Sequence, residues 1–115
     1  VRFPEYFREL YGQKTDLNVI LFYDVSDKDD LNRYDLIRGH IRTRAVENVC
    51  STLTVNAVSP CQTAPTMLTG ASGQVLAEAG RNREELLIYD FIPQLPDFGE
   101  RGRNEISDQL LLEIR

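Results

Sequence analysis

Residues 18–25 read NVILFYDV and residues 51–58 read STLTVNAV, and these two stretches decide the fold. The first is a continuous apolar run typical of a buried strand, and the second is rich in β-branched residues. Between them, apolar residues recur three or four positions apart, which is the spacing of an amphipathic helix. The order strand, helix, strand predicts an α/β or α+β fold.

Three helices are expected. The central helix follows an N-cap at Asp30 and ends near Asn48. Its predicted buried face consists of Tyr34, Ile37, Ile41, Ala45 and Val49. A short helix is predicted from Pro4 to Gly12, because proline suits a first helical turn and glycine ends a helix. Apolar residues at helical spacing, Ile106, Leu110 and Ile114, predict a third helix over residues 104–114.

The remaining segments predict short strands in a single domain. A strand near Met67, a turn over residues 70–73 and a returning strand over residues 74–79 form an expected hairpin. Residues 86–91, LLIYDF, predict another strand. Residues 93–103 contain two prolines and two glycines, which favours a surface connection.

Composition excludes several classes of function. The chain has 115 residues, with 18 acidic and 13 basic side chains and a net charge of −5. This balance argues against nucleic-acid or anionic-membrane partners, which bind a basic face. No apolar run approaches the roughly 20 residues that span a bilayer. Two cysteines and one histidine predict a reduced, cytoplasmic protein with no disulfide scaffold, metal or cofactor.

The residues that could carry chemistry are few. Cys50 lies ten residues after His40, the only imidazole, or about 15 Å along a helix, which is too far for direct proton transfer. We expect Cys50 to be packed and unreactive, and Cys61 to lie in a loop without a catalytic role. The acidic residues Asp27, Asp29 and Asp30 lack the glycine and terminal glutamate of an EF-hand, so we expect a solvated loop.

Three segments resemble the nitrilase superfamily of carbon–nitrogen hydrolases. Residues 1–5, VRFPE, match the end of the family motif C-Y-D-x-R-F-P-E. Residues 41–48, IRTRAVEN, resemble its R-A-R-A-x-E-N helix, and a strand ending in Asn56 follows. Residues 66–80, TMLTGASGQVLAEAG, resemble its hairpin, although Gly70 and Ala71 replace the usual Asp-Pro. The likeness continues to about Asp90, so residues 93–115 form a divergent tail.

The resemblance implies the C-terminal portion of an α-β-β-α sandwich, beginning just after the catalytic cysteine. In the family, a Cys nucleophile, a Glu base and a Lys hydrolyse an amide or nitrile through a thioester. All three would lie before Val1, which leaves no catalytic residue within this chain. Tyr23 and Asp24, at the end of the first strand, become candidates for lining the pocket of a small-molecule amide. Arg2, Arg44 and Glu47 are expected to form buried ion pairs that brace two helices.

The resemblance also implies a homodimer through the first two helices. The predicted interface consists of Tyr6, Phe7, Leu10, Arg38 and Arg42, because tyrosine and arginine are favoured in interface cores. Such pairing would give a discrete dimer, whereas an exposed sheet face would give heterogeneous oligomers. Two hypotheses stay open: part of an amidase-type hydrolase, or a truncated and inactive remnant that folds and self-associates.

Overall fold

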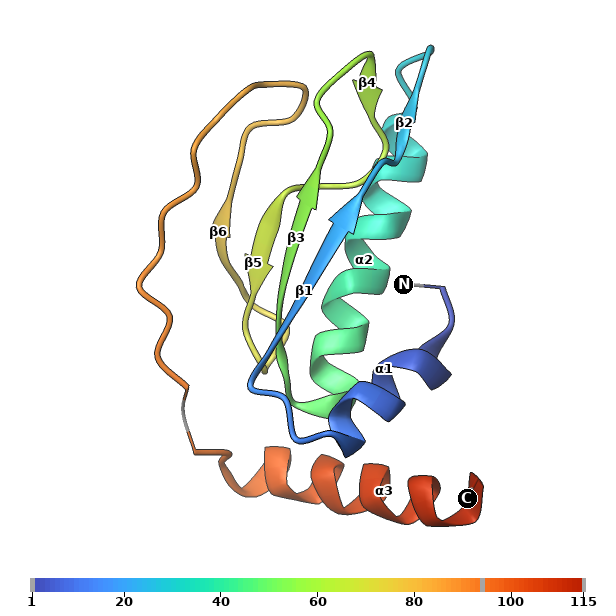
Figure 1. Cartoon of the computed structure of the whole chain (residues 1–115), viewed down its shortest axis with the longest axis vertical. Coiled ribbons are helices and arrows are strands. Elements are labelled where there is room, and N and C mark those ends of the chain that lie inside the picture. The colour runs from blue at the N-terminus through green and yellow to red at the C-terminus, as the bar shows by residue number, and fades with distance from the viewer. Residues whose placement is uncertain (1, 94, 115) are drawn as a thin grey trace.

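The structure, a computed structural model, describes residues 2–93 and 95–114 (Figure 1). Val1 and the side chain of Ile114, both used in the sequence predictions, lie outside the described part. The elements are, in order, α1 (Pro4–Gly12), β1 (Leu17–Phe22), β2 (Val25–Ser26), α2 (Leu31–Asn48), β3 (Ser51–Asn56), β4 (Cys61–Gln62), β5 (Met67–Thr69), β6 (Val75–Glu78) and α3 (Phe98–Ile114). None of the described helices is long and apolar enough to span a bilayer.

Four strands form one sheet in the order β1-β3-β5-β6. The first two are parallel and in register from Leu17 beside Ser51 to Phe22 beside Asn56, and the other pairs are antiparallel. The short strands β2 and β4 pair separately. Helix α2 covers one face of the large sheet (Figure 1), which confirms the predicted strand-helix-strand unit.

The core lies between α2 and this covered face, which we call the inner face. Ile37 and Ile41 from α2 pack with Ala64 and Met67, and Phe22 and Val75 border them. The predicted helix face is confirmed at four positions, because Tyr34, Ile37, Ile41 and Ala45 are all buried. Asp30 caps the helix as expected, its carboxylate accepting from the Arg33 N–H at 3.0 Å.

None of the described helices lies against the opposite face of the sheet, which we call the outer face. Successive side chains of a strand point to opposite faces of a sheet. Together with the pairing of the strands, this places Val19, Leu53, Leu68 and Ala77 in one row across all four strands. Leu21 and Val55 form a second row. The prediction that residues 18–25 form a strand buried on both sides is therefore wrong: β1 is an edge strand that ends at Phe22, and its outer side chains are exposed.

Two predictions for the C-terminal part are also wrong. Residues 86–91 are not a strand, because no neighbouring strand supplies backbone hydrogen bonds to them. The last helix begins at Phe98, inside the expected surface connection. The cause is a reciprocal cap in which the Asp97 carboxylate accepts from the Glu100 N–H at 2.8 Å and the Glu100 carboxylate accepts from the Asp97 N–H at 2.9 Å.

Helix α3 lies across the end of α2 (Figure 1). Arg103 donates from Nε to the Val46 carbonyl at 3.1 Å, and the Ser107 hydroxyl donates to the Glu47 carbonyl at 3.2 Å. Tyr11 of α1 donates to the Asp108 carboxylate at 2.9 Å. Burial and this carboxylate raise the pKa of Tyr11 to about 12, so its hydroxyl stays a donor at neutral pH.

Candidate functional site

The carboxyl ends of the parallel strands β1 and β3 meet at Phe22 and Asn56. The Asn56 side chain is buried, and its amide nitrogen donates to the Asp24 and Ala64 carbonyls, both at 2.8 Å. Its amide oxygen accepts from the Asp24 N–H at 3.0 Å. The Asn56 side chain thereby fixes the segment after β1 to the connection between β4 and β5, at the edge where open α/β sheets bind ligands.

Asp24 is the centre of this cluster. Its carboxylate accepts a short hydrogen bond from the Thr63 hydroxyl and pairs with the Arg33 guanidinium at 3.2 Å. Its backbone carbonyl accepts from the Thr63 N–H at 3.0 Å. Arg33 itself stands in the first turn of α2. We call Asp24, Arg33, Asn56 and Thr63 the Asp24 cluster; its side chains hold a carboxylate rigidly at the sheet edge.

A second group of contacts ties the neighbouring loops together. Arg81 pairs with Asp29, donates to the Gln62 carbonyl at 3.2 Å and lies 4.9 Å from the Tyr34 ring centroid. The hydrogen bond from Arg81 lowers the pKa of Asp29, and burial is the main cause that raises the pKa of Tyr34. Gln62 and Asn82 exchange two hydrogen bonds, at 2.6 and 2.8 Å. These loops therefore form a polar rim beside the Asp24 cluster.

The two predicted pocket residues behave differently. Asp24 lies at the strand end and is held by three residues, Asn56, Arg33 and Thr63, whereas Tyr23 is 82% exposed and is directed to solvent. Sequence reasoning named Asn56 only as part of a motif and missed Thr63. The available signal was an asparagine at the end of a β-branched strand, a residue that strands usually exclude.

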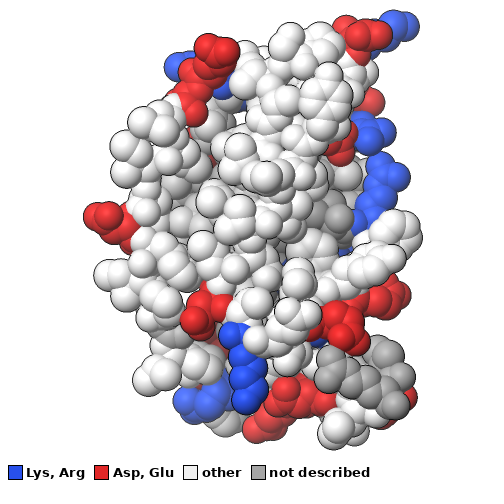
Figure 2. Space-filling view, in the orientation of Figure 1, with Lys and Arg blue, Asp and Glu red and all other residues white. Residues whose placement is uncertain are grey.

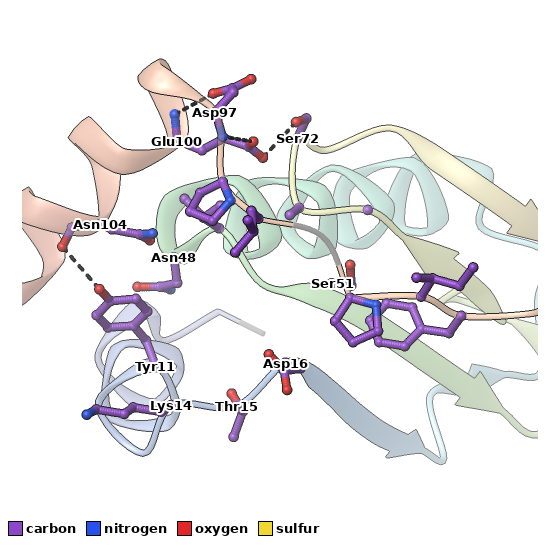
Figure 3. Close-up of a pocket in the computed structure, with 18 of the residues that line it drawn as sticks. Tyr11, Lys14, Thr15, Asp16, Asn48, Ser51, Ser72, Asp97, Glu100 and Asn104 are labelled. Carbon is purple, nitrogen blue, oxygen red and sulfur yellow. Dashed lines mark hydrogen bonds between the residues drawn. The ribbon is translucent and has the colours of Figure 1, made fainter.

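A hollow lies at the other end of the sheet (Figure 3). It measures about 770 Å³ and lies between the start of β3, α1, α3 and the segment after β6. Lys14, Thr15, Asp16, Asn48 and Ser51 contribute to its walls, and Glu100 accepts from Ser72 across its rim at 3.0 Å. Neither Tyr23 nor Asp24 lines it, so the hollow is separate from the predicted pocket.

Among the residues that the structure describes, neither Cys50 nor Cys61 is hydrogen-bonded to a basic side chain. Cys50 is only 3% exposed, which confirms the predicted packing, and burial raises the pKa of its thiol. Its sulfur contacts Thr15 and the Ser51 carbonyl, and none of these groups is a base. Cys61 belongs to β4, where a loop was predicted. The described residues contain no group of three His, Cys, Asp or Glu side chains that could hold a metal ion.

The structure shows one of the predicted ion pairs of Arg2, Arg44 and Glu47. Arg44 pairs with Glu47 at 2.7 Å, but both belong to α2, so this pair links two turns of one helix. Arg2 is exposed and forms no ion pair with Glu47. The prediction that Arg2 joins a buried pair is therefore wrong, because the chain before α1 runs along the surface.

The predicted dimer residues divide into two groups. Tyr6 is exposed on α1 and Leu10 is half-buried, whereas Phe7 is buried inside the chain and cannot serve as contact surface. Arg38 makes two hydrogen bonds of 2.9 Å to Glu78, and Arg42 donates to the Gly73 carbonyl at 2.8 Å. Both arginines therefore hold the β5–β6 hairpin against α2 within one chain.

Comparison with known proteins gives a likeness at the level of structure. No protein-family model matches the sequence, and a search of curated proteins finds no match. A carbon–nitrogen hydrolase from Helicobacter pylori G27 matches with a TM-score of 0.59 at 16% identity, over 72% of this chain and 34% of that one. Nit3 of Saccharomyces cerevisiae, from branch 10 of the nitrilase superfamily, matches with 0.57 at 18%, over 72% and 31%.

A third solved structure, an amidase of the nitrilase superfamily from Nesterenkonia AN1, matches with a TM-score of 0.52 at 22% identity, over 69% of this chain and 30% of that one. The chain thus spans about a third of the length of the structures it matches. Its fold is that of carbon–nitrogen hydrolases of the nitrilase superfamily, and the partial coverage fits a C-terminal portion of their α-β-β-α sandwich.

Proposed function

We propose that this chain is part of an amidase-type carbon–nitrogen hydrolase that cleaves a non-peptide C–N bond in a small amide. The fold likeness and the three sequence segments support the proposal. The observation that carries it is the Asp24 cluster at the carboxyl ends of β1 and β3, the edge of the sheet where ligands bind in open α/β folds.

The chemistry of this proposal follows from the family resemblance. A cysteine thiolate attacks the amide carbon, ammonia or an amine leaves, and water hydrolyses the resulting thioester. A glutamate acts as general base and a lysine stabilises the tetrahedral oxyanion. In this proposal all three residues lie on polypeptide outside these 115 residues.

The contribution of this chain is then one wall of the site. Asp24 is fixed by Asn56, Thr63 and Arg33, so its position would not change when a substrate binds. Tyr23 precedes it and has its ring free to contact substrate or the rest of the enzyme. We expect Asp24 to position the pocket and to take no part in the covalent steps.

Ammonia release from a panel of short amides tests the proposal. The 115-residue chain alone should release none above a buffer control, because its thiols have no base beside them. A coding frame that continues before Val1 through strands bearing Cys, Lys and Glu would supply the complete protein, and that protein should release ammonia. There, Asp24→Ala should reduce kcat/KM more than Asp27→Ala, a change in the neighbouring loop. Release by the short chain that Cys61→Ser abolishes would contradict the proposal.

A second function deserves equal treatment because the described chain pairs no thiol with a base. In this alternative the chain is a non-catalytic module that folds and self-associates, and its frame begins at or near Val1. A coding frame that begins at or near Val1, with a protein product that releases no ammonia from amides, would favour this alternative. The exposed outer face of the sheet is the observation in its favour.

A further inference from the structure

The carboxylate of Asp24 uses only one of its two oxygens in contacts with the described residues. Oδ1 accepts from the Thr63 hydroxyl and from the Arg33 guanidinium, the latter at 3.2 Å. No described residue donates to Oδ2, and Oδ2 is not one of the buried polar atoms that lack a partner, so it reaches solvent. A ligand at this edge of the sheet therefore meets a carboxylate oxygen that can still accept hydrogen bonds.

The access to Oδ2 does not come from the uncovered outer face. Phe22 borders the core beneath α2, and the ring of the next residue, Tyr23, is in solvent. The Asp24 carboxylate instead contacts Arg33 in the first turn of α2, the helix that covers the inner face. A layer packed on the outer face therefore lies on the other side of the sheet from this carboxylate.

The position of the carboxylate is fixed by bonds that leave Oδ2 unused. The Asn56 side chain bonds to both the N–H and the carbonyl of Asp24, and the Thr63 N–H donates to the same carbonyl at 3.0 Å. Backbone and carboxylate are both held in this way. A preorganised acceptor loses little conformational freedom when a ligand binds, so one contact to it can discriminate between ligands.

Charge decides which kind of donor suits this oxygen. Residues 24–33 contain four aspartates against Lys28 and Arg33, and Arg81 neutralises one further aspartate by pairing with Asp29. Figure 2 shows acidic and basic side chains next to each other at the upper right, where Figure 1 places β2 and the start of α2. An excess of negative charge remains, and it favours an ammonium group over a carboxylate or a neutral donor.

We propose that Asp24 is a specificity-determining residue whose Oδ2 binds a protonated amine of the substrate. The substrate is then an ω-amino amide, in which an ammonium group lies at the far end of the acyl chain. The inference rests on the proposed hydrolase function and adds a substrate class to it. A charge-assisted hydrogen bond is roughly twice as strong as a neutral one, and it holds a part of the substrate that does not react.

Ammonia release by the complete protein from four primary amides of similar size tests the proposal. The amides are 3-aminopropanamide, 3-hydroxypropanamide, butanamide and succinamate, which end in an ammonium, a hydroxyl, a methyl and a carboxylate group. Longer homologues of each extend the series to other separations between the amide and the end group. In the best-fitting length, kcat/KM for the ammonium amide should exceed that for the hydroxyl and methyl amides by about tenfold or more.

Two variants should move this preference in opposite directions. Asp24→Asn keeps the shape of the side chain but removes its charge, so the preference for the ammonium amide should be lost. Arg33→Gln removes the cation that shares the carboxylate, so the preference should rise. A merely structural role of Asp24 would lower kcat/KM for all four amides alike. Arg33→Gln alone decides the question if circular dichroism shows that Asp24→Asn is unfolded.

The matched control is Asp27→Asn, the same change of charge on an exposed side chain of the neighbouring loop. It should change the preference by less than about twofold, because water and salt screen an exposed charge. A loss of preference as large as that in Asp24→Asn would replace a specific contact by a diffuse field and overturn the proposal.

The remaining outcomes separate this inference from the proposed function. No ammonia from any amide, with the complete protein folded, would overturn both. Ammonia release with equal kcat/KM for the ammonium and methyl amides would overturn the inference alone and would mean that another group occupies Oδ2. A preference that survives Asp24→Asn would assign amine recognition to a different residue. A preference for succinamate would show that Arg33, rather than Asp24, binds the substrate.

Discussion

The inner face of the sheet carries Thr52, Thr54 and Thr69 in its buried centre, whereas the outer face carries Val19, Leu21 and Val55 in contact with solvent. Burial in this chain thus follows the position of α2 rather than side-chain polarity. The inner face is held by a few apolar contacts and by hydrogen bonds from the Thr52 and Thr54 hydroxyls to backbone carbonyls. The outer side chains of Val19, Leu21 and Val55 contribute little to the fold of one chain, because they are largely exposed to solvent.

The largest expected effect comes from comparing two residues of similar size, Met67 on the inner face and Leu21 on the outer face. Met67→Ala should destabilise the chain by about 3 kcal/mol, because it leaves a cavity in a fully buried site. Leu21→Ala should change the free energy of unfolding by less than about 0.5 kcal/mol in dilute solution. Urea unfolding followed by circular dichroism in dilute solution measures both. Equal losses would show that the outer face is already covered within one chain.

A smaller effect is expected at the polar end of the inner face. Asn56→Ala should cost about 2 kcal/mol, because the Asp24 N–H and the carbonyls of Asp24 and Ala64 lose their partner. The control Asn32→Ala, on the exposed side of α2, should leave the urea midpoint within error. An unchanged midpoint for Asn56→Ala would mean that water replaces the amide without cost.

The smallest expected effect is a difference in stability between substitutions of two threonines on the inner face. The Thr54 hydroxyl donates to the Pro65 carbonyl at 2.9 Å, while the buried Thr69 hydroxyl has no hydrogen-bond partner in the described structure. Thr54→Val should therefore destabilise by about 1 kcal/mol, and Thr69→Val should be neutral or stabilise by up to about 1 kcal/mol. Thermal unfolding of both variants beside the parent chain shows whether each substitution raises or lowers the stability. The same sign for both variants would remove hydrogen bonding as the explanation for the polar inner face.

The sequence was most informative where its signals are local. Pro4 and Gly12 mark the bounds of α1, and Asp30 marks the start of α2, because each acts through its own backbone or the next turn. The start of α3 was missed although Asp97 and Glu100 have capping-box spacing, since the nearby prolines and glycines favoured a loop. The strand expected at residues 86–91 has the right composition and lacks only a partner, which local sequence does not specify.

The candidate site was less predictable for the same reason. Position at a strand end indicated Asp24, but the partners that hold it, Asn56 and Thr63, lie 32 and 39 residues further along the chain. Nothing in residues 23–24 distinguishes the fixed carboxylate from the exposed Tyr23 ring. That difference depends on the connection between β4 and β5, which carries Thr63, lying against the segment after β1.

Helix α3 has a consequence for how the chain could be shortened. The last carbonyls of any helix lack partners within it, and at the end of α2 two of them are satisfied by Arg103 and Ser107, more than fifty residues away. The divergent tail is therefore part of the support for the central helix. A chain ending before Asp97 would keep every residue of the strand-helix-strand unit, yet the last turn of α2 would fray and its amide protons would exchange rapidly with solvent.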